Sequence, residues 1–107
     1  MEGVENESVP PAVERWSDGN VTVVKITGEV DLATVDAVER ELDPLMQTPP
    51  DRVVFDMAGV SFMDSSGIAL LLRVAERVAS VEVRDPSDAV EMVIRATGLS
   101  DVLRVES

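Results

Sequence analysis

The stretch from Arg52 to Ala79 decides the fold, and it reads RVVFDMAGVSFMDSSGIALLLRVAERVA. Its first part, 52–56, is a short apolar run that predicts a buried parallel strand. We expect a loop over 58–67 and then a helix from about Ser66 to Ala79, because apolar residues recur there at helical spacing. A strand that leads directly into a helix is the repeating unit of an α/β sheet.

The predicted helix has one broad apolar face. At about 100° per residue, that face carries Ile68, Leu71, Leu72, Ala75, Val78 and Ala79. Arg73 and Arg77 point the opposite way, and Leu70 falls near them. We therefore expect Leu70 on the surface. A single exposed leucine is ordinary, but its closeness to the helix start makes it a candidate partner contact.

The residues before this stretch predict a hairpin and a helix. Two prolines limit 9–16 to an edge strand, 18–20 is a turn signal, and β-branched residues predict a strand over 21–27. We expect 28–31 to break that strand and Asp31 to cap the next helix. The apolar face of this helix comprises Val35, Val38, Leu42 and Leu45, and prolines at 44, 49 and 50 bracket its end.

The residues after the stretch predict a strand over 81–83, a helix that begins near 86–88, and a last strand over 102–105. The inner side of this helix is expected to carry Ala89, Met92, Val93 and Ala96, with Gly98 as its C-cap. The order is then ββαβαβαβ. It predicts one small α/β domain over 9–107, with a mixed sheet of about five strands and about three helices packed on it. Residues 1–8 are expected to form a flexible acidic tail.

Composition excludes several classes of function. The chain has 107 residues, which suits one domain, and 21 acidic against 9 basic residues give a net charge of −12. Such a charge argues against nucleic acid and anionic membranes as partners, and favours a basic or neutral protein surface. Without a targeting segment, and with an apolar run at 68–72 too short to span a bilayer, we expect a cytoplasmic protein.

The absence of His and Cys narrows the chemistry further. It excludes histidine-based catalysis and zinc sites of the usual ligands. A catalytic serine would need a base, and the only lysine, Lys25, lies in a predicted strand. No glycine-rich phosphate loop is present. We therefore expect no enzyme, no cofactor and no metal. A magnesium site among Asp31, Asp36, Asp56 and Asp64 is the open alternative, but helix capping accounts for these residues better.

Two loops remain where function would lie, because sites in such sheets form beyond the carboxyl ends of the strands. They are 28–31 and 62–67, and each leads into a helix. In the second loop, Asp64 precedes Ser65 and Ser66. One interpretation is capping alone, since Asp and Ser are common N-caps. The other is covalent modification, because a helix N-terminus tolerates the charge of a phosphate.

These motifs resemble a known family. The segment 60–68 resembles the signature loop of STAS domains of the bacterial anti-sigma-factor antagonist type. The segment 27–31 looks like the second signature of the family, and 97–99 matches a third. The resemblance covers roughly residues 9–105, and it implies a small mixed sheet with helices packed on it.

The resemblance implies partner switching. In this family a serine kinase, which is itself the anti-sigma factor, phosphorylates the antagonist. The unphosphorylated antagonist binds that kinase and frees a sigma factor, and a metal-dependent serine phosphatase restores binding. By motif, the phosphoacceptor falls on Ser65 and the helix-capping aspartate of the binding surface on Asp31. Asp64, Ser66 and Gly67 are expected to shape the acceptor loop and, with Leu70, to contact the partner.

Two alternatives stay open at this point. One is a non-phosphorylated STAS scaffold subunit of a transport or stress-signalling complex, although the acceptor hydroxyl favours the switch. The other is a nucleotide-binding or hydrolysing domain. The chain also differs from the family pattern, with a short loop before Val81 and an end at Ser107 where many relatives carry a further helix. These differences bear on packing and oligomeric state, and a monomer or weak dimer is expected.

Overall fold

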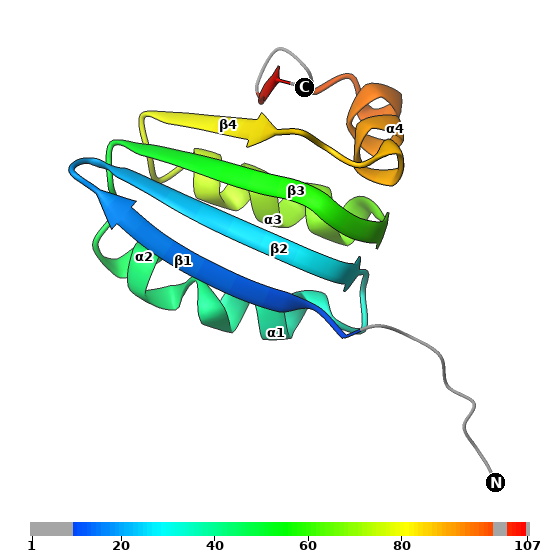
Figure 1. Cartoon of the computed structure of the whole chain (residues 1–107), viewed down its shortest axis with the longest axis horizontal. Helices are drawn as coiled ribbons and strands as arrows, with labels where there is room; N and C mark the ends of the chain where they lie inside the picture. Colours follow the sequence, from blue (N-terminus) through cyan, green and yellow to red (C-terminus); the bar gives the residue numbers. More distant parts are fainter. Residues whose placement is uncertain (1–9, 100–102, 107) are drawn as a thin grey trace, which may run out of the picture.

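Five strands form one mixed sheet in the order β1-β2-β3-β4-β5 (Figure 1). The computed structural model describes residues 10–99 and 103–106. Strand β1 runs antiparallel to β2, and the other neighbouring pairs are parallel. The predicted fold class and the order ββαβαβαβ are confirmed. The strands are β1 (Ala12–Asp18), β2 (Val21–Val30), β3 (Arg52–Met63), β4 (Ser80–Arg84) and β5 (Arg104–Glu106).

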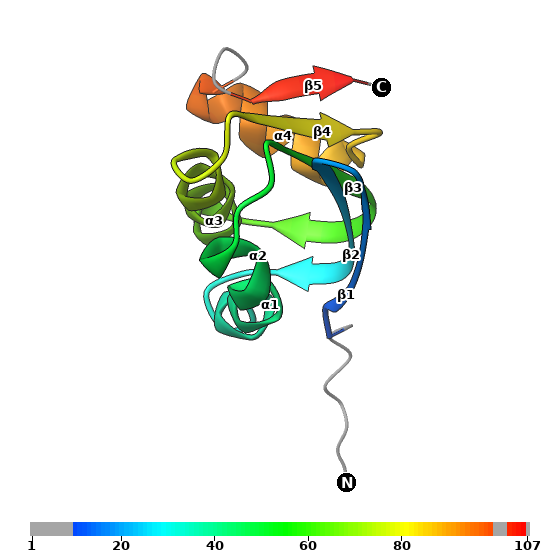
Figure 2. The ribbon, with the colours of Figure 1, turned by 90° about the vertical axis from the view of Figure 1, so that its left-hand side faces the viewer.

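The helices leave one face of the sheet open. In Figure 2, α1, α2 and α3 lie together on the same side of the strands, while α4 packs against β3 and α3. Figure 1 looks onto the opposite face, where no helix covers the strands. The helices are α1 (Val35–Glu41), α2 (Asp43–Gln47), α3 (Ser65–Ala75) and α4 (Asp88–Thr97). No helix in the described ranges is long and apolar enough to cross a membrane.

The core lies between the sheet and these helices, because alternate residues of each strand point toward them. Val24, Phe55 and Val83 are fully buried there. The helical faces predicted for the first two helices supply the other half of the core. Among their buried members are Val35, Val38, Leu42, Leu45, Ile68 and Leu71.

Strands β2 and β3 are longer than expected, because each pairs with the other to its end. The break predicted at 28–31 and the loop predicted from 58 are wrong, since β2 continues to Val30 and β3 to Met63. The extra length contains two register shifts, and Gly28 has a φ of 97°. A Cβ on Gly28 would lie 2.5 Å from the carbonyl oxygen of Pro10. The glycine therefore bends the strand without ending it.

Helix boundaries also differ from the expected ones. The first predicted helix is interrupted at Leu42, and Pro44 lies in the first turn of α2 and not at a helix end. Helix α3 stops at Ala75 with Glu76 as its C-cap, and Arg77 beyond it donates a hydrogen bond from Nη2 to the carbonyl of Met46, at 2.9 Å. The last strand begins at Arg104, and the residue at 102 lies outside the described residues, as does the expected tail over 1–8.

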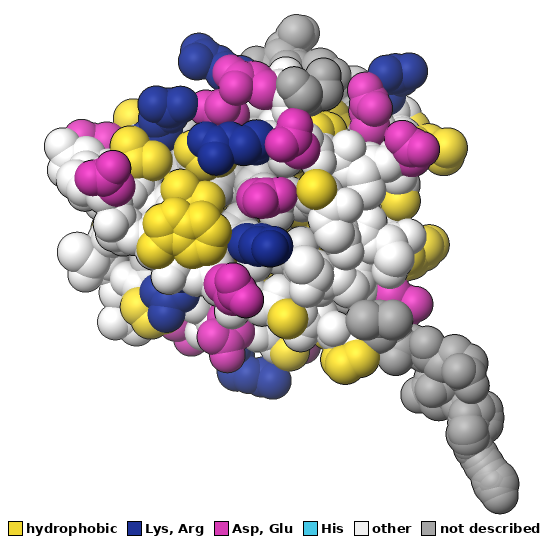
Figure 3. All heavy atoms as spheres, in the orientation of Figure 1, with side chains coloured by type: hydrophobic (Ala, Val, Ile, Leu, Met, Phe, Trp, Pro, Cys, Tyr) yellow, Lys and Arg dark blue, Asp and Glu magenta, His cyan; other side chains and the backbone are white. Residues whose placement is uncertain are grey.

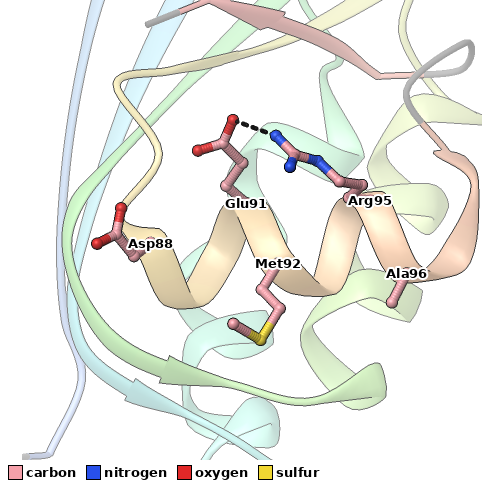
Figure 4. A pocket seen from close by; sticks show the side chains of 5 residues that line it. All are labelled: Asp88, Glu91, Met92, Arg95 and Ala96. Carbon is pink, nitrogen blue, oxygen red and sulfur yellow. Dashed lines mark hydrogen bonds and ion pairs between the residues drawn. The ribbon is translucent and has the colours of Figure 1, made fainter.

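Helix α4 is rotated relative to the expected orientation. Val90 and Ile94, four residues apart, pack into the core, whereas Met92 is 70% exposed. Figure 4 shows the outer side of this helix, where Arg95 pairs with Glu91 at 3.0 Å. The predicted inner face was therefore wrong for Met92 and for Ala96, which are both exposed. The C-cap is confirmed, because Gly98 is left-handed with a φ of 72°.

A buried carboxylate lies on the open face of the sheet. Glu82 is 3% exposed and pairs with Arg52 from the neighbouring strand. The hydrogen bond from Arg52 lowers the pKa of Glu82, and Glu82 in turn raises the pKa of Glu106. Because the pKa of Glu82 is lower in the folded chain, its contribution to stability is present above the unfolded value of about 4.3 and is lost as pH falls below it.

Replacing Arg52 tests this pair. We expect Arg52→Met to lower the free energy of unfolding at neutral pH, because Glu82 then remains buried without its main partner. The deficit relative to the wild type should shrink as the pH falls, because Glu82 in the folded variant lacks Arg52 and takes up a proton at a higher pH than in the folded wild type, whereas the two unfolded chains take up protons alike. Urea unfolding from about pH 7 to about pH 3 measures both effects.

Arg95→Met is the matched control, because Arg95 is an exposed partner of Glu91 on α4. Exposed pairs of this kind contribute about 0.5 kcal/mol or less. An Arg52→Met deficit that stays constant over the pH series would contradict the assignment to Glu82.

Candidate functional site

Two turns lie side by side at one end of the sheet. Because β2 and β3 are parallel neighbours, their last residues Val30 and Met63 are register partners. The turns that follow each strand therefore start next to each other. The backbone amide of Asp64 donates to the carbonyl of Val30 at 3.2 Å, which joins the two turns directly. Both expected loops thus form one site, although each is shorter than predicted.

The Asp64 carboxylate connects the two turns. Its Oδ1 accepts from the amide of Ser66 at 2.8 Å, as an N-cap of α3. Its Oδ2 accepts from the amide of Leu32 in the other turn at 3.3 Å. One side chain therefore caps a helix and also holds the neighbouring turn in place. The capping interpretation of Asp64 is confirmed, and the bond to Leu32 adds to it.

The Asp31 carboxylate organises its own turn. Its Oδ1 accepts from the amides of Ala33 and Thr34, at 3.0 and 3.1 Å. The Thr34 hydroxyl donates to the carbonyl of Glu29 at 2.9 Å. Helix α1 begins only at Val35, so Asp31 caps the turn that precedes the helix and not the first turn of the helix itself.

The two serines differ in their exposure. Ser65 is the first residue of α3 and is exposed, whereas Ser66 is half-buried and its amide is bonded to Asp64. Within the described ranges, the Ser65 hydroxyl takes part in none of the hydrogen bonds of the turn. It is therefore free to meet another molecule. The amide donors and the dipole of the helix N-terminus favour negative charge at this position.

Gly67 allows α3 to approach the strand ends closely. It is buried, and a Cβ there would lie 2.5 Å from Cγ of Met63 and 3.2 Å from Cγ1 of Val30. A larger residue would force the side chain of Met63 to move or the first turn of α3 to shift. Gly67 therefore shapes the site from beneath and has no side chain to offer a partner.

Leu70 is not on the surface, and the expectation that it is exposed was wrong. It is 2% exposed, because α3 packs against α1 and α4 as well as against the sheet. A helix with neighbours on several sides buries more than one face. Leu70 thus cannot contact a partner while the domain stays folded as described.

Two exposed apolar residues beside the site were missed in the sequence. Leu32 is 78% exposed in the turn after Asp31, and Phe62 is 48% exposed next to the end of β3. The signal for Leu32 was present, since it is a large apolar residue in a loop between Asp31 and Thr34. Phe62 had been placed within a loop, so its exposure on a strand was not considered.

The aspartates considered for magnesium are distributed over the domain. Asp56 lies in the middle of β3 and Asp36 in α1, while Asp31 and Asp64 belong to the two turns. Among the residues described, no group of three acidic side chains is arranged to hold a metal ion.

Comparison with known proteins relates the chain to one family. The sequence profile of the STAS domain matches residues 13–107. The anti-sigma-B factor antagonist of Staphylococcus aureus is 29% identical over 97 residues, which cover 87% of this chain and 90% of that protein.

Solved structures have the same fold. An anti-sigma factor antagonist from Mycobacterium paratuberculosis superposes with a TM-score of 0.83 at 25% identity, over 92% of this chain and 89% of that one. The phosphorylated form of the Bacillus cell fate determinant SpoIIAA superposes with a TM-score of 0.68 at 20% identity, over 90% and 92% of the two chains. The second likeness concerns the fold alone.

Removing the Asp64 carboxylate should loosen both turns. We expect Asp64→Ala to cost about 1 to 2 kcal/mol of stability, as for other strong N-caps. The amide of Leu32 should also exchange with deuterium faster, because its acceptor is gone. Urea unfolding and amide hydrogen exchange measure the two effects.

Ser87→Ala is the matched control, because the hydroxyl of Ser87 caps only its own helix, at the amide of Val90. It should lower stability by about 1 kcal/mol without changing exchange at Leu32. Equal exchange at Leu32 in Asp64→Ala and the wild type would show that the bond between the turns does not form.

Proposed function

The chain belongs to the STAS domain family and to its anti-sigma-factor antagonist type, and from this we propose that it is a phosphorylation-controlled partner switch. Unphosphorylated, it binds an anti-sigma factor that is also a serine kinase. Phosphorylation of Ser65 releases that partner. The chain would thereby control transcription that depends on a sigma factor, and it would act as a regulator in the cytoplasm and not as an enzyme.

The exposed hydroxyl of Ser65 at the N-terminus of α3 is the observation that carries this proposal. A kinase must reach the acceptor oxygen, and Ser65 is exposed while Ser66 is half-buried. The acceptor also follows Asp64, whose carboxylate is already bonded to two amides. The contacts that hold the turn in place are therefore made by Asp64 and Gly67, and the Ser65 hydroxyl remains free for modification.

A phosphate on Ser65 would act on the partner more than on the fold. It adds roughly two negative charges at pH 7. The positive end of the α3 dipole lies beside it and offsets part of the electrostatic cost. A partner that packs over the same turn gains no such compensation, because the phosphate has to be desolvated beside the apolar residues of the contact. The domain stays folded, but its surface no longer fits the surface of the anti-sigma factor.

The surface available to the partner combines polar turns and apolar side chains. Asp31 and Ser66 hold the shape of the turns, Leu32 exposes apolar area in the turn that is bonded to Asp64, and Phe62 is exposed near the end of β3. Leu70 and Gly67 are both buried, so they support the turns from the core and do not touch the partner. An acidic chain with apolar residues at its binding site suits a partner whose surface has basic residues around an apolar centre.

Dephosphorylation would complete the cycle. A metal-dependent serine phosphatase acting on phosphorylated Ser65 would restore binding, and the metal would belong to the phosphatase. Exposure of Ser65 supports this step as well, because the phosphate has to enter the active site of a second enzyme.

The phosphorylation site can be tested by intact mass. After incubation with Mg-ATP and an anti-sigma kinase from the same genome, we expect one phosphate on the wild type and on Ser66→Ala, and none on Ser65→Ala. Ser65→Ala should still bind the kinase. Ser65→Asp should fold normally and bind about tenfold more weakly or worse, because it introduces part of the phosphate charge.

Each outcome has a distinct meaning. Phosphate on Ser65→Ala would move the acceptor to another residue. Stable kinase binding without any phosphate would identify a constitutive antagonist or a scaffold subunit. Unchanged affinity of Ser65→Asp would contradict the electrostatic account of release.

The apolar part of the surface has its own test. We expect Leu32→Ser to weaken binding of the anti-sigma factor about tenfold, a loss typical of an apolar contact residue at an interface centre. Its stability should stay close to that of the wild type, since Leu32 is 78% exposed. Trp16→Ser serves as the control, because Trp16 is 49% exposed on β1, far from Val30 in the register. Equal binding by Leu32→Ser and the wild type would exclude Leu32 from the interface.

A further inference from the structure

The open face of the sheet carries a row of alternating charges, one residue on each strand. In register across the sheet, the charge row consists of Glu14, Lys25, Asp56, Arg84 and Glu106. Figure 3 looks onto this face, where acidic and basic side chains lie interspersed together with hydrophobic ones. Such strict alternation across a whole sheet sets this face apart from a uniformly acidic surface.

A second row lies beside the charge row and is partly apolar. Trp16, Val23, Val54 and Glu82 are register partners on four successive strands. Trp16 is 49% exposed, whereas Val54 is 1% exposed although it lies outside the main core. This face therefore offers a large aromatic side chain at its edge and charged groups across its middle.

Cross-strand attraction within one chain is the simplest explanation of the charge row. The ion pairs among the described residues, however, join Arg52 to Glu82, Arg73 to Glu39 and Arg95 to Glu91. None of them joins two members of the charge row. Four of its five members are exposed, and Asp56 is half-buried. Glu14, Lys25, Asp56 and Arg84 are thus available to another surface, whereas Glu106 interacts with Glu82 of its own chain.

The first four members, Glu14, Lys25, Asp56 and Arg84, form an order of charges that is complementary to its own reverse, and Glu106 is left outside the facing strands. We propose that the open face binds a second copy of this chain, about a two-fold axis that runs parallel to the strands between β2 and β3. Rotation about this axis reverses the row, so that Lys25 faces Asp56 of the second copy and Asp56 faces its Lys25. In the same arrangement Glu14 faces Arg84, and every facing pair has opposite charge.

The geometry is one that sheets adopt. A two-fold axis parallel to the strands keeps the strand directions of both sheets aligned, as in aligned sheet packing at about −30°. Because the sheets cross at that angle, contacts are best near the axis, where Lys25 and Asp56 lie. An axis along the row would instead place each charge opposite itself. The charge pattern therefore selects one arrangement over the other.

The net charge of −12 limits the strength of this association. Two such chains repel each other at long range, but salt at about 0.15 M screens charges separated by more than about 8 Å. The facing pairs of the charge row are closer than that and are screened less. We therefore expect a weak dimer. The helices lie on the other side of the sheet (Figure 2), so Ser65 on α3 stays outside this interface.

Charge reversal tests the arrangement. We expect sedimentation velocity at about 0.15 M salt to show the wild type passing from monomer to dimer as its concentration rises. Lys25→Glu and Asp56→Lys should each weaken self-association about tenfold or more, because like charges then face each other. An equimolar mixture of the two variants should associate where neither does alone, since each facing pair is again opposite.

Trp16 gives an independent signal, because it is the only tryptophan of the chain. Its fluorescence should shift to the blue as the dimer forms and the indole leaves water. The controls are Arg40→Glu and Asp36→Lys, which make the same charge changes at exposed positions of α1. Both should associate like the wild type.

The test can be completed even if one of the charge-reversal variants fails to fold. Asp56 also accepts from the amide of Ala58 at 3.3 Å. If circular dichroism shows that Asp56→Lys is unfolded, Asp56→Asn replaces it, because the amide oxygen keeps this bond. Mixed with Lys25→Glu, it removes the like-charge contact and should restore association in part.

Two outcomes would overturn the proposal. The wild type stays monomeric at every concentration, or the mixture associates no better than its components. If the wild type stays monomeric and Lys25→Glu also loses binding to the anti-sigma factor, the open face belongs to a contact with that different protein. None of these results bears on phosphorylation of Ser65, which is read by mass.

Discussion

The carboxylate of Asp64 is the interaction on which the site depends. It accepts one amide from α3 and one from the turn after β2, so a single side chain holds together segments more than thirty residues apart, at 2.8 and 3.3 Å. The parallel pairing of β2 and β3 makes this possible, because it ends both strands at the same edge. Without that register, Asp31 and Ser65 would belong to unrelated loops.

This division of roles is compatible with the switch that we propose. Folding contacts at the turn are made by the Asp64 carboxylate and by the close approach at Gly67, and not by the Ser65 hydroxyl. Ser65 contributes an exposed hydroxyl at the N-terminus of α3, where the positive end of the helix dipole lies. A modified Ser65 therefore changes the surface at little cost to stability, whereas modification of a capping group would change both.

Sequence patterns predicted the elements better than their lengths and surroundings. The alternation of strands with apolar helical faces was sufficient for the order of elements along the chain and for the position of the turn before α3, since both follow from local spacing. The continuation of β2 past Gly28 was not predictable, because it depends on pairing with β3, whose register shifts at this point. Leu70 was misplaced for a related reason, since a helical wheel assumes one buried face and α3 has neighbours on several sides.

The two faces of the sheet follow different constraints. The helix side is mostly apolar, with Thr22 as a buried polar exception, so its residues are dictated by packing and reveal little about partners. The open face has no such requirement, yet it carries opposite charges in strict register across all five strands. In a chain with more than twice as many acidic as basic residues, placing Lys25 and Arg84 between acidic neighbours uses scarce positive charge on one face. Solubility alone would not require this placement, but recognition of a complementary face would.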